Sequence, residues 1–203
     1  MRDVVPKDSR YIPLTQQKAC CVPTCIQMVM LKHNLPLIPA EELGHHIGLV
    51  VHPDKAYLFY NVRTSRKKPP SGYGTRIYYP KFNPNKAFKE LRLPVSLTII
   101  PISKFNSPKE LQQYLRMAES NDKDILLCFN HGALINDPSK DWGHVCVFDR
   151  LIDNKIRIID SSPDQPKWRL VSVMKMFQAM RKHGEKRSGG VWELSVRKVR
   201  TKS

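Results

Sequence analysis

Residues 14–31 read LTQQKACCVPTCIQMVML and place three of the chain's five cysteines behind a pair of glutamines and ahead of an apolar run. Apolar residues recur at helical spacing through the second half of this stretch, and Pro23 is tolerated in a first turn, where its missing N–H would have no partner. Asn34 then interrupts the pattern. The stretch therefore predicts a helix over about residues 21–33, with Cys21 at its N-terminus.

A cysteine at this place is a candidate nucleophile. The thiolate is the reactive form, and a helix N-terminus stabilises it through unpaired N–H groups and partial positive charge. The thiolate also needs an imidazole to take its proton and a third group to hold that ring in one tautomer. His144 opens a β run directly after Gly143, a residue small enough to admit a substrate, and Asp160 closes the next β run. We therefore predict Cys21, His144 and Asp160 as nucleophile, base and orienting carboxylate.

The turn between these two β runs decides whether the histidine and the aspartate share a face. A strict two-residue turn at Asp153 and Asn154 puts the two side chains on opposite faces. One extra residue brings Asp160 opposite Cys146 and diagonal to His144, at about 7–8 Å between backbones. The assignment therefore predicts an odd loop or a β-bulge in this hairpin.

An acyl-transfer site also needs a donor for the oxyanion that develops on the attacked carbonyl. A side-chain amide just upstream of the nucleophile, together with the N–H of the nucleophile itself, meets this need. Gln16 and Gln17 both qualify. Gln16, five positions before Cys21, is favoured because Gln17 leaves a tighter loop.

The remaining pattern is helices first and strands later, which is typical of the α+β class. Helices are expected at 40–47, 84–91, 107–117 and 169–182, and strands at 95–101, 124–130, 143–151, 155–160 and 191–196. In the last helix the expected buried stripe is Leu170, Val173, Met174, Phe177 and Met180. We expect one domain over residues 1–203, with a helical part at about 14–92 and a sheet part at about 93–199.

Two parts of the chain resemble a known family. QQKACCVPTCIQMVM resembles the Q…CGPACLAM pattern of papain-like cysteine peptidases in the branch that removes double-glycine leader peptides from bacteriocins, and GHVCVFD with IIDSSP resembles that branch's later GHxVVV and DP segments. Alignment on Pro23 makes Cys21, rather than Cys20, the counterpart of the nucleophile. Val22 stands where the family has glycine, and the usual glutamine spacing falls on Thr15.

The resemblance implies a papain-like fold in which an N-terminal helical part packs on a C-terminal antiparallel β-sheet, with the site between them. It also implies a thiol hydrolase that cleaves a peptide or isopeptide bond of a peptide or protein substrate, without a cofactor or metal. The same nucleophile would serve an acyltransferase or a deamidase. These reactions remain alternatives at the level of the sequence.

The amino-acid composition argues against a membrane protein or a disulfide scaffold and allows an acidic partner. Apolar residues make up 41% of the 203 positions and no apolar run reaches the about 20 residues of a membrane span, so we expect a globular, cytoplasmic protein. The odd cysteine count argues against a disulfide scaffold, and Cys128 and Cys146 are expected to act as small core hydrophobes. The net charge of +16 allows an acidic partner or nucleic acid, with basic clusters at 63–68, 181–187 and 197–202.

Three other interpretations compete with the enzyme hypothesis. A cysteine such as Cys21 is often only a buried small side chain, and the basic clusters could belong to a non-catalytic module that binds nucleic acid. A zinc site is the rival chemistry. Its ligands would come from Cys20, Cys21, Cys25 and one of His45, His46 or His52, but their spacing matches no compact ligand pair.

Overall fold

The computed structural model describes residues 6–54, 57 and 73–197. Six strands form one antiparallel sheet in the order β1-β6-β2-β3-β4-β5. The strands are β1 (Val95–Pro101), β2 (Asp124–Asn130), β3 (Gly143–Ile152), β4 (Lys155–Ile159), β5 (Trp168–Ser172) and β6 (Gly190–Val196). The basic cluster at 63–68 and nearly all of the basic tail at 197–202 lie outside the described residues.

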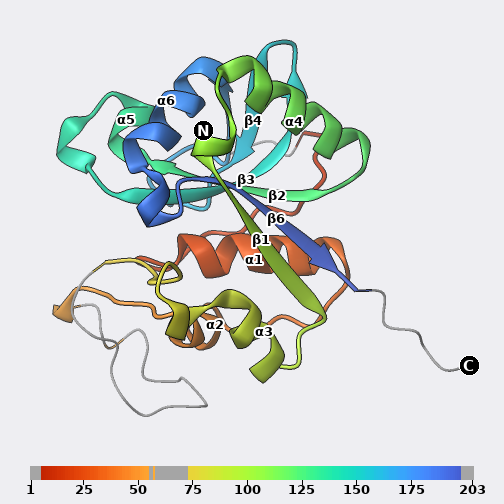
Figure 1. Ribbon diagram of the computed structural model, residues 1–203. Helices are drawn as coiled ribbons and strands as arrows, with labels where there is room; N and C mark the ends of the chain where they lie inside the picture. The colour runs from red at the N-terminus through yellow and green to blue at the C-terminus, as the bar shows by residue number, and fades with distance from the viewer. Residues whose placement is uncertain (1–5, 55–56, 58–72, 198–203) are drawn as a thin grey trace, which may run out of the picture.

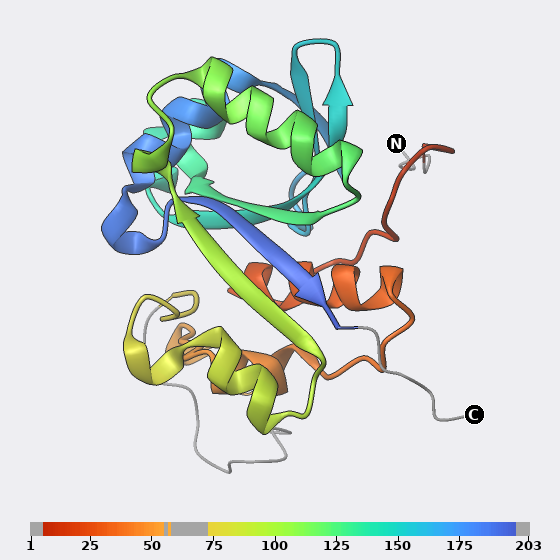
Figure 2. The same cartoon turned by 45° about the vertical axis from the view of Figure 1, so that its right-hand side comes forward.

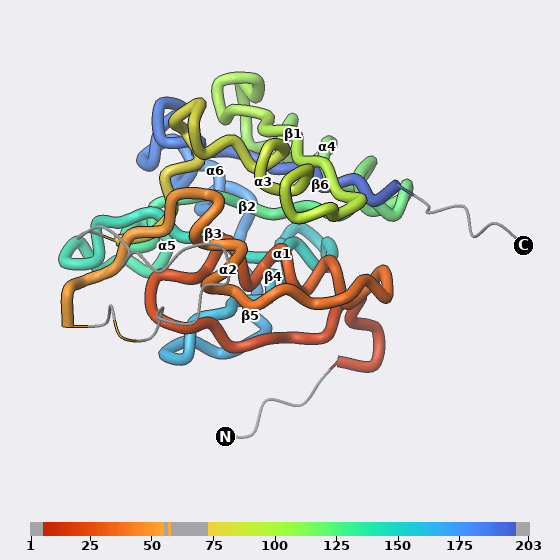
Figure 3. Tube along the Cα trace, turned by 90° about the horizontal axis from the view of Figure 1, so that it is seen from below, coloured from red at the N-terminus to blue at the C-terminus, as the bar shows by residue number. Residues whose placement is uncertain are grey.

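A layer of helices covers each face of the sheet (Figure 1). One layer holds α1 (Cys21–Lys32), α2 (Ala40–His46) and α3 (Pro84–Glu90), and the other holds α4 (Pro108–Ser120), α5 (His131–Ile135) and α6 (Val173–His183). Seen from below, α1 and α2 lie in front of the central strands, and α3 lies toward β1 and β6 (Figure 3). The α+β, papain-like architecture expected from the sequence is confirmed.

The two layers enclose two apolar cores because strand side chains alternate between faces. In β3, Val145 and Val147 pack in the core beneath α1, whereas Cys146 and Phe148 pack in the core beneath α4 and α6. Cys128 lies in the first core, so both strand cysteines are buried as expected. All five cysteines are free and buried.

Local sequence signals set several of the helix starts. Asn83 caps α3 by accepting from the backbone N–H of Asn85 at 2.8 Å, and Ser107 caps α4 by accepting from the N–H of Glu110 at 3.2 Å. Each helix then begins with a proline, which needs no partner for its nitrogen. In the described part of the chain, no helix combines the length and apolarity that crossing a bilayer requires.

The helix predicted over 169–182 is wrong in its first turn. Residues 168–172 form strand β5, which pairs with β4, and α6 begins only at Val173. Ser172 ends the strand and caps the helix by accepting from the N–H of Lys175 at 3.3 Å. Two members of the expected stripe, Leu170 and Met174, are consequently 53% exposed each. The short helix α5 was not predicted.

The β3–β4 hairpin contains the irregularity that the site assignment required. Ile152 pairs with Lys155 across a two-residue turn, but the register shifts at Asp149, which has no partner in β4. Val147 consequently pairs with Ile159. The extra residue moves Asp160 onto the face of the sheet that carries His144 and Cys146, which confirms the predicted bulge.

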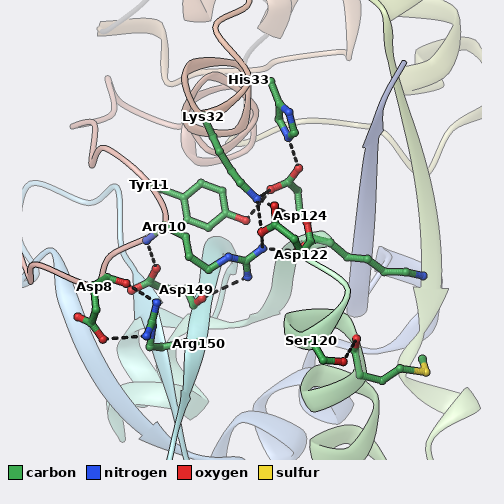
Figure 4. A network of polar contacts seen from close by, with 12 residues as sticks. Asp8, Arg10, Tyr11, Lys32, His33, Ser120, Asp122, Asp124, Asp149 and Arg150 are labelled. Carbon is green, nitrogen blue, oxygen red and sulfur yellow. Dashed lines mark hydrogen bonds and ion pairs between the residues drawn. The ribbon is translucent and has the colours of Figure 1, made fainter. Parts of the chain in front are cut away.

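A polar network joins the segment before α1 to the sheet (Figure 4). Arg10 donates to Asp122 at 2.9 Å, and Lys32 of α1 donates to both Asp122 and Asp124 at 2.8 Å. The Tyr11 hydroxyl donates to Asp124 at 2.8 Å. Figure 2 shows this segment running beside the sheet before it turns into α1. The network fixes the approach of the chain to the helix N-terminus.

Candidate active site

Cys21 is the first residue of α1 and is 7% exposed. Ala19, two positions earlier, has a φ of +64°, a left-handed conformation that non-glycine residues seldom adopt, and the chain enters the helix from it. The neighbouring Cys20 is fully buried with Leu49 and Val51, and this burial raises the pKa of its thiol far above the ordinary value. Of the adjacent pair, Cys21 is therefore the thiol that reaches a cavity.

His144 and Asp160 form a buried hydrogen-bonded pair. The ring nitrogen Nε2 lies 2.7 Å from Oδ1 of Asp160, and since a carboxylate only accepts, this nitrogen carries the proton. Asp160 also accepts from the backbone N–H of Ser162 at 3.0 Å and from Arg169 at 2.9 Å. Burial favours the neutral carboxyl, but the hydrogen bonds from His144 and Ser162 and the charge of Arg169 outweigh it and hold the pKa of Asp160 well below its usual value.

The pair leaves His144 ready to act as a base through its other nitrogen. Burial disfavours the charged ring, yet interactions with the Cys146 sulfur, the Asp160 carboxylate and the Cys21 sulfur together raise the pKa of His144 above its ordinary value. Burial raises the pKa of Cys146 to about 12, so its thiol is neutral at physiological pH and Asp160 supplies the charge. Because Nε2 faces Asp160, Nδ1 is the nitrogen left for Cys21.

Gln16 is held by the residue that follows Asp160. Its side-chain Oε1 accepts from the Ser161 hydroxyl at 2.7 Å, and its backbone N–H donates to the Ser161 carbonyl at 2.9 Å. With the oxygen engaged, the amide N–H groups of Gln16 are the ones left to face a ligand. Gln17 is exposed and makes no such contact among the described residues. The geometry therefore favours Gln16 over Gln17 as a donor.

Two cavities meet at the His144 ring. The larger, of about 390 Å³, is lined by Cys21, Val22, Cys128 and residues of the 73–79 segment. The smaller, of about 200 Å³, is lined by Gln16, Gln17 and residues 162–165. Tyr73, Trp142 and His144 border both, so the two cavities form one groove past the cysteine and the imidazole.

Gly143 makes room for a side chain of the fold as well as lining the larger cavity. A Cβ built on it would lie 2.4 Å from Cε1 of His183, a ring of α6. The His183 ring donates through Nε2 to the carbonyl oxygen of Arg187, which lies 3.0 Å away in the turn after α6. A carbonyl only accepts, so this nitrogen is protonated.

Sequence reasoning missed three residues around the pair. Arg169 binds the second oxygen of Asp160. His131 packs edge-on against His144 with ring centroids 4.9 Å apart and stacks on Trp142 at 5.8 Å. Burial, followed by the charge of His144, lowers the pKa of His131 to about 4, so this ring stays neutral. Arg169 and His131 reach the site from elements that are joined to it only in the fold, so no local signal marks them, whereas Trp142 lies two positions before His144.

The residues considered as ligands for the rival zinc site do not gather in the described part of the chain. There the one group with metal-ligand spacing is His144, Cys146 and Asp160, whose donor atoms lie within 4.8 Å of one another. These three residues form a hydrogen-bonded pair beside a neutral thiol. A proton lies between His144 and Asp160, and the Cys146 sulfur is protonated at physiological pH. His45 and His46 end α2, as a helix C-terminus favours.

An antiparallel sheet with a helix that presents a cysteine beside a strand histidine is the fold of the C39-like and other papain-like cysteine peptidases. Among solved structures, the chain is similar to a crystal structure described as that of a candidate C39-like peptidase from Bacillus anthracis. The TM-score is 0.52 and the sequences are 16% identical over 92% of this chain and 95% of that one. At this identity the likeness establishes the fold and does not extend to the double-glycine branch. No family model and no curated protein matches the chain.

Proposed function

We propose that the protein is a thiol hydrolase that cleaves a peptide or isopeptide bond through an acyl-enzyme on Cys21. The observation that carries the proposal is the buried pair of His144 and Asp160, 2.7 Å apart, on the wall of the cavity that Cys21 lines. A cysteine at a helix N-terminus beside an oriented imidazole is the arrangement that activates a thiol. The structural neighbour is described as a candidate peptidase, which supports a peptide or protein as substrate.

The reaction begins with proton transfer from the Cys21 thiol to Nδ1 of His144. The thiolate sulfur then attacks the substrate carbonyl, and the oxyanion accepts hydrogen bonds from the Gln16 amide and the Cys21 backbone N–H. The imidazolium returns the proton to the leaving amine as the C–N bond breaks, which leaves a thioester on Cys21. Water, deprotonated by His144, attacks this thioester and releases a carboxylic acid and the free thiol.

The electrostatics of the pair of His144 and Asp160 support this first proton transfer. The raised pKa of His144 means that the ring holds the transferred proton firmly, and the Asp160 carboxylate remains charged at every physiological pH. The hydrogen bond that Nε2 donates to Asp160 also fixes the tautomer that leaves Nδ1 free. The proposed roles follow from these contacts.

Alkylation by iodoacetamide, followed by peptide mass spectrometry, tests the proposal. We expect Cys21 to react faster than the other four thiols at neutral pH, because it is 7% exposed against 0–3% for the others and lies at a helix N-terminus beside His144. His144→Ala should slow this reaction by about 10-fold or more, while Cys20→Ser, the matched control, should leave it unchanged. Equal labelling of all thiols, or a Cys21 rate indifferent to His144→Ala, would overturn the proposal.

A further inference from the structure

The larger cavity carries two arginines from different layers of the fold. Arg76 belongs to the 73–79 segment, and Arg187 ends the turn that follows α6. Figures 1 and 2 both show these two segments, yellow and blue, facing each other beside the sheet. Arg76 donates to the backbone oxygen of Tyr73 at 3.1 Å. Within the described part of the chain, neither guanidinium has a carboxylate partner.

The other charged groups of this cavity do not cancel the two arginines. Asp141 lines it as well, but its Oδ1 accepts a hydrogen bond from Nδ2 of Asn130 at 2.7 Å. Burial lowers the pKa of His183, and the charge of Arg187 lowers it further, so this ring is neutral at physiological pH. Two guanidinium groups therefore face one carboxylate, and the lining has a net positive charge.

Exposed aromatic rings complete the walls. Four large aromatic side chains that line the cavity are at least one third exposed: Tyr73, Tyr78, Tyr79 and Trp142. Exposed aromatic surface concentrated at one place, with unpaired guanidinium groups beside it, is typical of a binding site rather than of a general solvated surface. Guanidinium groups favour carboxylates because they match them in charge and in geometry.

We propose that this cavity binds a substrate residue that carries a carboxylate, on the acyl side of the cleaved bond, with Arg76 and Arg187 as its partners. The proposal rests on the proposed function. The acyl group is attached to Cys21, which lines this cavity and not the smaller one, so the acyl side of the substrate occupies the larger cavity. The smaller cavity, with Gln16 and His144, then receives the leaving amine.

Matched pairs of peptidyl vinyl sulfones test this selectivity. The two members of each pair differ only by glutamate or glutamine, at either of the two residues before the electrophile, and the rate of Cys21 modification is followed by intact-protein mass. We expect the glutamate probe to react about 10- to 100-fold faster in one of the pairs, as for a lost charge-assisted hydrogen bond. Raising the salt concentration should reduce this preference.

Substitutions of Arg76 and Arg187 test whether these two side chains bind the substrate carboxylate. Arg76→Gln and Arg187→Gln should each lower the preference several-fold, the double variant should abolish it, and Arg76→Lys should retain part of it because the charge remains. Arg116→Gln is the matched control, since Arg116 is exposed on α4 in the helix layer on the opposite side of the sheet from Cys21. It should change nothing.

The outcomes separate this proposal from the proposed function. Equal rates for the glutamate and glutamine probes at both positions, or a preference that survives in the double variant, would overturn the carboxylate site. If Cys21 still reacts with iodoacetamide in a manner dependent on His144, the thiol hydrolase stands and only its selectivity is wrong. If Cys21 reacts with neither reagent, the proposed function itself fails.

Discussion

The substitution Asp160→Asn would test the buried hydrogen bond between His144 and Asp160, because asparagine has nearly the same shape as aspartate. Oδ1 of Asp160 now accepts from His144 and Oδ2 accepts from Arg169. An asparagine that keeps its oxygen toward His144 turns its amide group against the Arg169 guanidinium, donor against donor. The flipped amide donates to Nε2 of His144 instead and forces the ring proton onto Nδ1. Both orientations lose the ion pair with Arg169; the first also loses the hydrogen bond from Arg169, and the second leaves Nδ1 protonated and unable to act as the base.

The size of the expected loss in unfolding free energy follows from the burial of the Asp160 contacts. Asp160 is fully buried and the Arg169 side chain is 16% exposed, so solvent screens the lost contact only weakly. A hydrogen bond to a charged group contributes about 1.5–3 kcal/mol, and breaking a buried ion pair costs about 3–5 kcal/mol. We expect Asp160→Asn to lower the free energy of unfolding by about 2–4 kcal/mol. The rate of Cys21 alkylation at neutral pH should fall by about 10- to 100-fold.

The pH dependence of this loss has a defined sign. The folded pKa of Asp160 lies below its unfolded value of about 3.9, so its contribution is present above that pH and is lost as the pH falls toward the folded pKa. The folded pKa of His144 lies above its unfolded value of about 6.5, so its contribution is complete below that pH and is lost as the pH rises through the folded pKa. The difference from wild type should be widest between about pH 4 and 6.5.

Urea denaturation at pH 5.5 and at pH 9, with iodoacetamide kinetics alongside, measures both effects. The difference in unfolding free energy between wild type and Asp160→Asn should be larger at pH 5.5 than at pH 9. Asp160→Glu is a useful companion because it keeps the charge and displaces it. An asparagine variant as stable as wild type at pH 5.5, with an unchanged alkylation rate, would refute the reasoning about the pair.

Three further predictions concern the support of the site. Ser161→Ala removes the donor to Gln16 and should slow hydrolysis of an activated peptide ester about 10-fold with alkylation unchanged, because only hydrolysis develops an oxyanion. Gly143→Ala, whose Cβ would meet His183 at 2.4 Å, should lower the unfolding free energy by about 1–3 kcal/mol in thermal denaturation, and His183→Ala should restore most of it. Arg10→Ala should lower the unfolding free energy by about 1 kcal/mol in urea, because it frees the segment before α1.

Local chemistry accounts for what the sequence could predict. The start of α1 follows from Pro23 and the apolar spacing behind it, and the caps of α3 and α4 follow from Asn83 and Ser107. These signals act within one turn of the chain, so they need no knowledge of the fold. Five of the six strands were predictable from short runs rich in apolar and β-branched residues.

What could not be predicted depends on neighbours that are distant in sequence. Residues 168–172 have helical apolar spacing, yet they pair with β4, and tertiary pairing overrides local preference. Arg169 consequently lies on a strand that brings it to Asp160, where the sequence pattern had placed it on a helix. His131 reaches His144 and Trp142 only because β2 and β3 are neighbours. No spacing rule links these positions.

The bulge in the β3–β4 hairpin was predictable only in part. The chemistry of the site required an extra residue, since an aspartate on the opposite face could not orient His144, but the sequence did not show where that residue lies. The structure places it at Asp149, whose buried carboxylate accepts from Arg157 at 2.6 Å and from the backbone N–H of Arg10 at 2.9 Å. A buried carboxylate with these partners is costly to move to another register. The segment before α1 therefore helps to set the register that brings Asp160 to His144, as well as the position of Cys21.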